Sequence, residues 1–128
     1  IQALASLARP LKARNNLATL FYNDQVISPD DSFASIGPAI GSASTVLIPW
    51  HGGITVGSSI GRAAALHVTL ENMAKLDVMM ESTGGPEIPE EQRGSLKKLV
   101  DDVADYLGLT WSLLQREVTN EYGTVNGS

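Results

Sequence analysis

The side chains of this sequence best suited to bind a metal or transfer a proton near neutral pH are its two histidines, His51 and His67. The chain has no cysteine, which excludes disulfides, thiol catalysis and cysteine-ligated zinc or iron–sulfur sites. Catalytic zinc is often held by three histidines. One copy of this chain therefore cannot supply a three-histidine site by itself.

His51 stands where a short apolar run, Thr45-Val46-Leu47-Ile48, gives way to two glycines. The run is rich in β-branched residues and predicts a strand buried on both faces. Chemistry in α/β proteins is commonly placed where such a strand exits into a loop, and the glycines would let a ligand approach closely. We interpret His51 as a candidate metal ligand or acid–base group. The alternative is a histidine that only hydrogen-bonds a loop carbonyl. Trp50 beside it either walls a pocket or lies in an interface.

A second motif, Gly57-Ser58-Ser59-Ile60-Gly61, matches the G-x-S-x-G elbow of serine hydrolases. That chemistry needs a histidine later in the chain. His67 is the only one, and it lies on the same expected helix at a different azimuth, where it would not meet Ser59. We therefore predict that Ser58 or Ser59 caps the helix and that His67 packs within the fold or at an interface. A serine hydrolase that uses Ser59 is the alternative.

The acidic residues show no spacing typical of a metal site. Glu90-Glu91 and Asp101-Asp102 have no histidine at ligand spacing, so we interpret them as solvated helix faces and partners of the helix dipole. The net charge is −5 and the basic residues form no run, whereas nucleic-acid binding needs clustered cations. We predict no nucleic-acid partner. The residues alone identify no catalytic group and no binding site for an organic cofactor.

The sequence also lacks the signals of a membrane protein. No apolar run approaches the roughly 20 residues of a membrane span, and the N-terminus has no charged-then-apolar signal pattern. We expect a cytoplasmic protein without membrane contact.

The elements that must position these residues follow from hydrophobic periodicity and turn signals. We expect a single domain over residues 1–118 and a flexible polar tail over 119–128. Within the domain we predict helices over residues 1–8, 11–22, 33–40 and 59–81, and a last helix from Pro89 to 118 with a kink or break at Gly108. Strands are predicted over 25–28, 45–48 and 54–56, the last two forming an antiparallel hairpin around a loop at His51-Gly52-Gly53.

The stretch Val46–Gly57, followed by Ser58–Ala64 and Leu70–Ala74, resembles the class II aldolase/adducin superfamily. In that superfamily, the corresponding region consists of an apolar strand, Asn-His-Gly, a short apolar strand ending in glycine, a helix with an early alanine, and a Leu-Glu pair. The opening Ala3–Leu11 resembles the family helix that follows a His-x-His motif. The resemblance covers roughly residues 1–83.

This resemblance implies an α/β fold, a class II aldolase/adducin-like sheet flanked by helices and incomplete at the N-terminus. It implies a divalent metal, usually zinc, held by the His-x-His pair and by the histidine of the Asn-His-Gly loop, which corresponds to His51. The activity implied is lyase or carbonyl chemistry on a small hydroxy- or keto-compound, with the metal as Lewis acid. Family members are commonly homo-oligomers, often tetramers, with sites near subunit boundaries.

The sequence departs from the family pattern at several positions. The His-x-His pair would fall just before Ile1, so we expect the chain to be the C-terminal portion of a larger enzyme and to be inactive alone. Trp50 replaces the asparagine, and neither Asn15 nor Asn16 is the tyrosine that sugar-phosphate aldolases supply across the subunit boundary. Two alternatives follow: a non-heme iron oxygenase or decarboxylase on the same scaffold, and a non-catalytic, adducin-like oligomerisation module.

Overall fold

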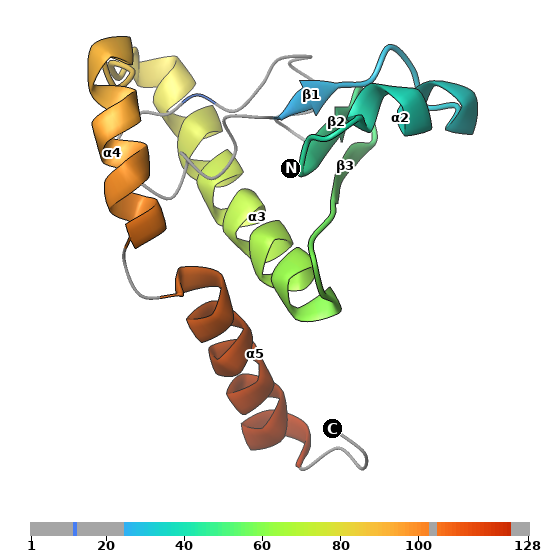
Figure 1. Cartoon of the computed structure of the whole chain (residues 1–128), viewed down its shortest axis with the longest axis vertical. Helices are drawn as coiled ribbons and strands as arrows, with labels where there is room; N and C mark the ends of the chain where they lie inside the picture. Colours follow the sequence, from blue (N-terminus) through green and yellow to red (C-terminus); the bar gives the residue numbers. More distant parts are fainter. Residues whose placement is uncertain (1–11, 13–24, 103–104, 124–128) are drawn as a thin grey trace.

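A small mixed sheet organises the chain. The computed structural model describes residues 12, 25–102 and 105–123. Within them β1 (Val26–Ile27), β2 (Thr45–Ile48) and β3 (Gly52–Thr55) form a three-stranded sheet in the order β1-β2-β3. β1 runs parallel to β2, and β3 runs antiparallel to it (Figure 1). Apart from Lys12, the helices expected over residues 1–8 and 11–22 lie outside the described residues.

The central strand β2 is buried along its whole length, as its apolar run predicts. Val46 and Leu47 are completely inaccessible to solvent. The Ser28 N–H donates to the Leu47 carbonyl at 2.9 Å and extends the parallel pairing one residue past β1. The strand predicted over residues 25–28 is therefore present.

The antiparallel hairpin of β2 and β3 is confirmed, but its loop is shorter than we expected. Ile48 pairs with Gly52, and Leu47 pairs with Gly53. Both glycines thus belong to the strand, and the loop consists of Pro49, Trp50 and His51. Glycine has a weak strand preference, and here the backbone pairing to a fully buried neighbour outweighs it.

Helix α2 (Phe33–Ile40) has the predicted bounds. Ser32 caps its N-terminus, since the Ser32 side chain accepts a hydrogen bond from the Ser35 N–H. Pro38 lies within the helix and does not end it. None of the residues of α2 is buried, so the helix covers the sheet only loosely, beside β1 and β2 (Figure 1).

Helix α3 (Ile60–Thr83) packs the sheet into a core. Ser59 caps its N-terminus by accepting from the Arg62 N–H, as predicted, and Gly84 ends it in the left-handed conformation, at φ 68°. The apolar residues Leu66, Leu70 and Met73 of α3 pack in one cluster with Leu47 of β2. The core cluster comprises Leu47, Ala65, Leu66, Leu70, Met73, Ala74 and Leu107. Burial of each large side chain contributes about 1.5–3 kcal/mol.

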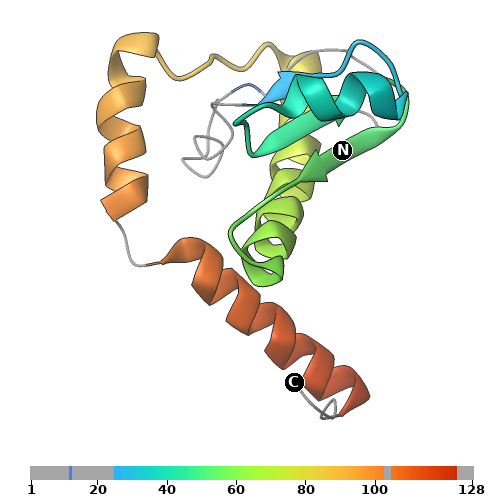
Figure 2. The ribbon, with the colours of Figure 1, turned by 45° about the vertical axis from the view of Figure 1, so that its right-hand side comes forward.

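The last predicted helix is broken into two, α4 (Glu90–Asp102) and α5 (Tyr106–Tyr122), so the break that we expected as an alternative to a kink is present but its position is wrong. The break precedes Gly108 rather than falling on it. Asp105 caps α5 by accepting from the Gly108 N–H, so a new helix starts there. α5 also continues past Val118 into the segment that we expected to be a polar tail. Figure 2 shows α4 standing apart from the sheet and α5 running away from the base of α3.

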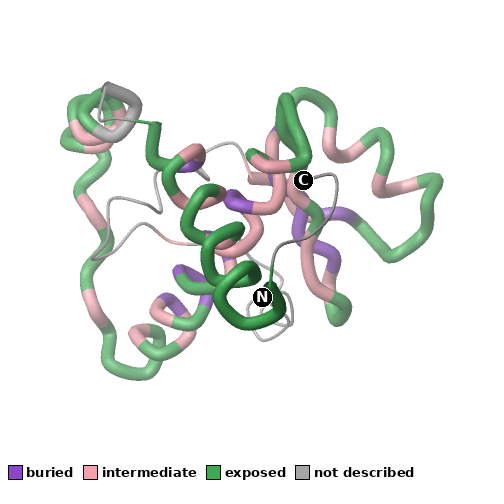
Figure 3. Tube along the Cα trace, turned by 90° about the horizontal axis from the view of Figure 1, so that it is seen from below, coloured by how far each residue is buried: buried purple, intermediate pink, exposed green. Residues whose placement is uncertain are grey.

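Buried positions concentrate where α3 meets β2 and the start of α5 (Figure 3). The described side chains of α4, by contrast, are all exposed or half-buried. Glu90 and Glu91 are exposed in its first turn, as predicted. None of the described helices combines the length and hydropathy that a membrane crossing requires.

Candidate functional site

His51 occupies the last position of a tight turn at the closed end of the β2–β3 hairpin. Its N–H donates to the Ile48 carbonyl at 3.0 Å. Pro49 fixes a negative φ at the second position of this turn, and Trp50 at the third has φ 67°. That combination is the pattern of a type II turn. The turn holds the His51 imidazole outside the sheet, where its side chain is 59% exposed.

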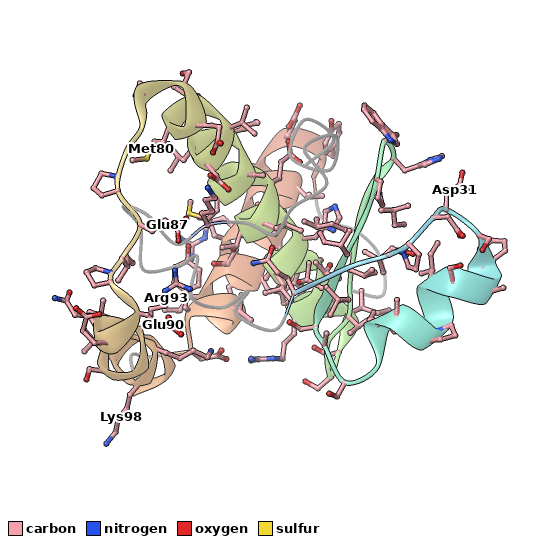
Figure 4. All side chains as sticks on the ribbon, turned by 90° about the horizontal axis from the view of Figure 1, so that it is seen from above. Asp31, Met80, Glu87, Glu90, Arg93 and Lys98 are labelled. Carbon is pink, nitrogen blue, oxygen red and sulfur yellow. The ribbon has the colours of Figure 1, made fainter. Side chains whose placement is uncertain are left out.

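Asp31 is the partner that the fold brings to His51. β1 and β2 are parallel, so the residues that follow them emerge at the same edge of the sheet, the edge at which α/β proteins bind ligands. The His51 Nε2 lies 2.8 Å from the Asp31 Oδ2. Figure 4 labels Asp31 on the loop between β1 and α2. The Asp31 side chain is 62% exposed, and pairs as exposed as this one add about 0–1 kcal/mol to stability.

The neighbouring acid, Asp30, holds the loop in place. Its Oδ1 accepts from the Ser32 hydroxyl at 2.7 Å and from the Ser32 N–H at 2.9 Å. These two hydrogen bonds, with a weaker contribution from the Ser35 hydroxyl, lower the pKa of Asp30 below its usual 3.8. The Ser28 hydroxyl donates to the Asp30 carbonyl at 2.6 Å. The loop that carries Asp31 is thus tied both to β1 and to the cap of α2.

These groups line a shallow groove of about 270 Å³ formed by the two loops. One imidazole, two carboxylates and the Trp50 indole face it; the lining residues are Pro29, Asp30, Asp31, Pro49, Trp50 and His51. Such a set can bind a cation or exchange a proton. In the part of the chain that the structure describes, however, no three metal-ligating side chains lie close enough to share an ion. His51 and Asp31 can contribute ligands to a metal but cannot complete a three-ligand site alone.

His67 belongs to a different environment. Its Nδ1 lies 3.2 Å from the Thr55 Oγ1, and the Thr55 hydroxyl donates to the Ala63 carbonyl at 2.9 Å. Since that hydroxyl has a single hydrogen, its contact with His67 is one in which the Nδ1–H donates. The contact joins α3 to β3. This agrees with the packing role predicted for His67.

The serine elbow does not assemble a catalytic triad. The Ser59 hydroxyl accepts from the Arg62 N–H at 3.2 Å and caps α3. The histidine that the chemistry would need is hydrogen-bonded to Thr55. The structure therefore favours the capping role for Ser59 over the hydrolase alternative.

Sequence reasoning missed Asp31. It follows β1 by only a few residues, but β1 is short and its parallel pairing with β2 could not be read from periodicity. The sequence signal for the pair of Asp31 and His51 is an acidic residue shortly after one strand and a histidine shortly after the strand that runs parallel to it.

Comparisons with known proteins bear on this arrangement. No family model matches the sequence, and no curated protein matches it. Solved structures do match. An L-fuculose 1-phosphate aldolase from Glaciozyma antarctica PI12 superposes with a TM-score of 0.76 at 22% identity, covering 96% of this chain and 51% of that one. An aldolase II superfamily protein from Pseudomonas syringae gives a TM-score of 0.78 at 14% identity, covering 95% and 53%.

This chain has the class II aldolase-like fold. The α/β fold class predicted from the sequence is thereby confirmed. The chain spans about half the length of the two solved structures. At these identities the likeness establishes the class II aldolase-like fold alone.

Proposed function

We propose that His51 is one ligand of a divalent-metal site in an enzyme with class II aldolase-like chemistry. The reaction would be lyase or carbonyl chemistry on a small hydroxy- or keto-compound, with zinc as the first metal to test and iron as the alternative. One observation carries the proposal: the exposed His51 imidazole lies 2.8 Å from the Asp31 carboxylate, at the edge of the sheet where α/β proteins commonly bind ligands. The name of one structural match, an L-fuculose 1-phosphate aldolase, supports the reaction class.

The described residues would do two things at such a site. His51 would donate an imidazole nitrogen, and Asp31 would orient the ring, since metal-bound histidines usually donate their other N–H to a carboxylate or carbonyl. A bound metal supplies Lewis-acid polarisation of a carbonyl oxygen. The remaining ligands would come from outside the described residues or from a second subunit.

A non-catalytic interaction module is the second candidate. Trp50, which lines the groove, is 73% exposed, and Phe33, two residues after Asp31, is 95% exposed; exposed aromatic side chains of this kind suit a protein contact. This module would need no metal, so metal binding separates the two candidates.

Zinc binding by the protein expressed from its complete gene tests the proposal. We expect His51→Ala to lower zinc affinity at least about tenfold, measured by calorimetry and by the visible spectrum of the Co²⁺-substituted protein. His67→Ala is the matched control, because it removes an imidazole bonded to Thr55 and should leave zinc affinity unchanged. Equal zinc affinity in His51→Ala and the parent protein would contradict the role of His51.

Cleavage of L-fuculose 1-phosphate is the first activity to assay, because one structural match carries that name. If the protein binds metal but does not cleave this compound, the proposed metal site stands and other hydroxy- and keto-compounds should be tested as substrates. Absence of both would favour the interaction module.

A further inference from the structure

A second pocket lies at the open end of the β2–β3 hairpin, whereas His51 lies at the closed end. Its volume is about 300 Å³, at the lower limit for small-molecule sites. Ser44, which precedes β2, lines it together with Val56 and Gly57, which follow β3. The two pockets share no lining residue. This second pocket is therefore separate from the groove at His51.

Two of the residues that line this pocket belong to the core. Leu66 of α3 and Leu107 of α5 line it, and they are only 5% and 6% exposed. Both belong to the hydrophobic core cluster. A ligand that enters the pocket would thus place carbon atoms, rather than polar groups, against these two side chains.

The charged groups that line the pocket are cations from two different helices. Arg62 comes from α3 and Lys97 from α4, and no carboxylate is among the described residues that line it. This contrasts with the net charge of −5 of the whole chain. Lys97 is half-buried, while its neighbour Lys98 is exposed and points away from the fold (Figure 4).

The Arg62 guanidinium forms an exposed ion pair with Asp105. Its Nη1 lies 3.2 Å from the Asp105 Oδ1, at the start of α5. A guanidinium has five N–H donors, so this one contact leaves donors for an anion. Gly57 packs closely against the first turn of α3, since a Cβ at Gly57 would come within 3.0 Å of the Ala63 nitrogen.

We propose that this pocket binds a small organic anion, a carboxylate or phosphate monoester with a short apolar part. The anionic group would lie between Arg62 and Lys97, and the apolar part would lie against Leu66 and Leu107. The fixed N-terminal end of α3 adds a favourable field for negative charge. This site is independent of the proposed metal site, so either one can fail without the other.

Amide NMR titrations test the site directly on the 128-residue chain. Inorganic phosphate and butyrate are the probes, and sodium chloride at matched ionic strength is the reference. We expect saturable shifts of the Gly57, Arg62 and Leu107 amides with at least one probe, and none at His51. Stronger binding of butyrate would assign the site to carboxylates, and stronger binding of phosphate would assign it to phosphate esters.

A matched pair of variants tests the role of the cation. Lys97→Met should weaken binding about tenfold, the loss expected for one charge-assisted hydrogen bond, whereas Lys98→Met removes the same charge from the exposed face and should change it less than about twofold. Circular dichroism checks that both variants fold. Equal effects of the two substitutions would overturn the proposal. Chloride shifts that match those of the probes would also overturn the proposal, because the anions would then only screen charge. Shifts confined to residues outside the pocket would overturn it as well.

Discussion

Trp50 is held in a backbone conformation that suits other residues better. Its φ of 67° lies in the left-handed region, which costs a residue with a Cβ about 1–2 kcal/mol. Asparagine tolerates this region, and the family pattern that the sequence resembles has asparagine at this place. The indole is 73% exposed, so little burial offsets the strain. Strain of this kind persists most often at functional sites.

Replacing Trp50 by asparagine should therefore stabilise the chain by about 1 kcal/mol, measured by urea unfolding. Trp50→Ala is the control, since it removes the indole without relieving the left-handed backbone and should not stabilise. A lower unfolding free energy for Trp50→Asn than for the parent chain would show that the indole makes stabilising contacts.

Asp30 gives the candidate site a pH dependence. Hydrogen bonds from Ser32 lower the pKa of Asp30 below 3.8, so the folded state binds its proton less readily than the unfolded state does. The stability that this carboxylate contributes is present above pH 3.8 and is lost as the pH falls through the lowered pKa. We expect the Asp30 side-chain carbon signal to titrate with a midpoint below 3.8, and Ser32→Ala to move the midpoint upward. An unchanged midpoint in Ser32→Ala would contradict this account.

At the residue scale, the sequence indicated His51 but not Asp31, its partner at the candidate site. His51 could be singled out because an apolar strand and two glycines flank it. Asp31 could not, because its role depends on the parallel register of a two-residue strand. The cap at Ser59 was predictable because capping is a local property of the chain.

At the scale of elements, local signals predicted α2, α3 and the hairpin, and they failed where a distant contact decides. An apolar stripe runs through residues 96–118, so periodicity favoured one helix. Asp105 divides it: its Oδ1 accepts from the Gly108 N–H and lies 3.2 Å from Arg62 on α3. The spacing of apolar residues within 96–118 gives no indication of the contact between Asp105 and Arg62.

Substitution of Asp105 should separate its two roles. Asp105→Ala removes both the cap and the ion pair and should cost about 1–2 kcal/mol of unfolding free energy. Asp105→Asn keeps an acceptor for the Gly108 N–H and should cost less than about 1 kcal/mol. Thermal unfolding checks both variants. Equal losses would mean that the ion pair, rather than the cap, holds the start of α5.

At the scale of the molecule, the edge of β3 that no described strand covers predicts self-association. In the described sheet β3 pairs with β2 on one side only, and an open edge of this kind invites pairing with another chain. Ile54 on this strand is 38% exposed. We expect sedimentation to show an oligomer that Ile54→Lys weakens at least about tenfold, since an edge lysine opposes strand pairing. Ile60→Lys adds the same charge on α3, where Ile60 is 84% exposed, and should change association less. A chain that sediments as a monomer would contradict this prediction.

Helix α4 lacks a buried side chain among its described residues. Arg93 anchors its beginning, with its Nε 3.3 Å from the Ile88 carbonyl and its Nη2 3.1 Å from Glu87. A helix with so little buried area opens at a small free-energy cost while the core stays closed. Its backbone amides should therefore exchange with deuterium long before those of α3. An anion held between Lys97 and Arg62 would slow that exchange, so the exchange rates of α4 would report the occupancy of the pocket.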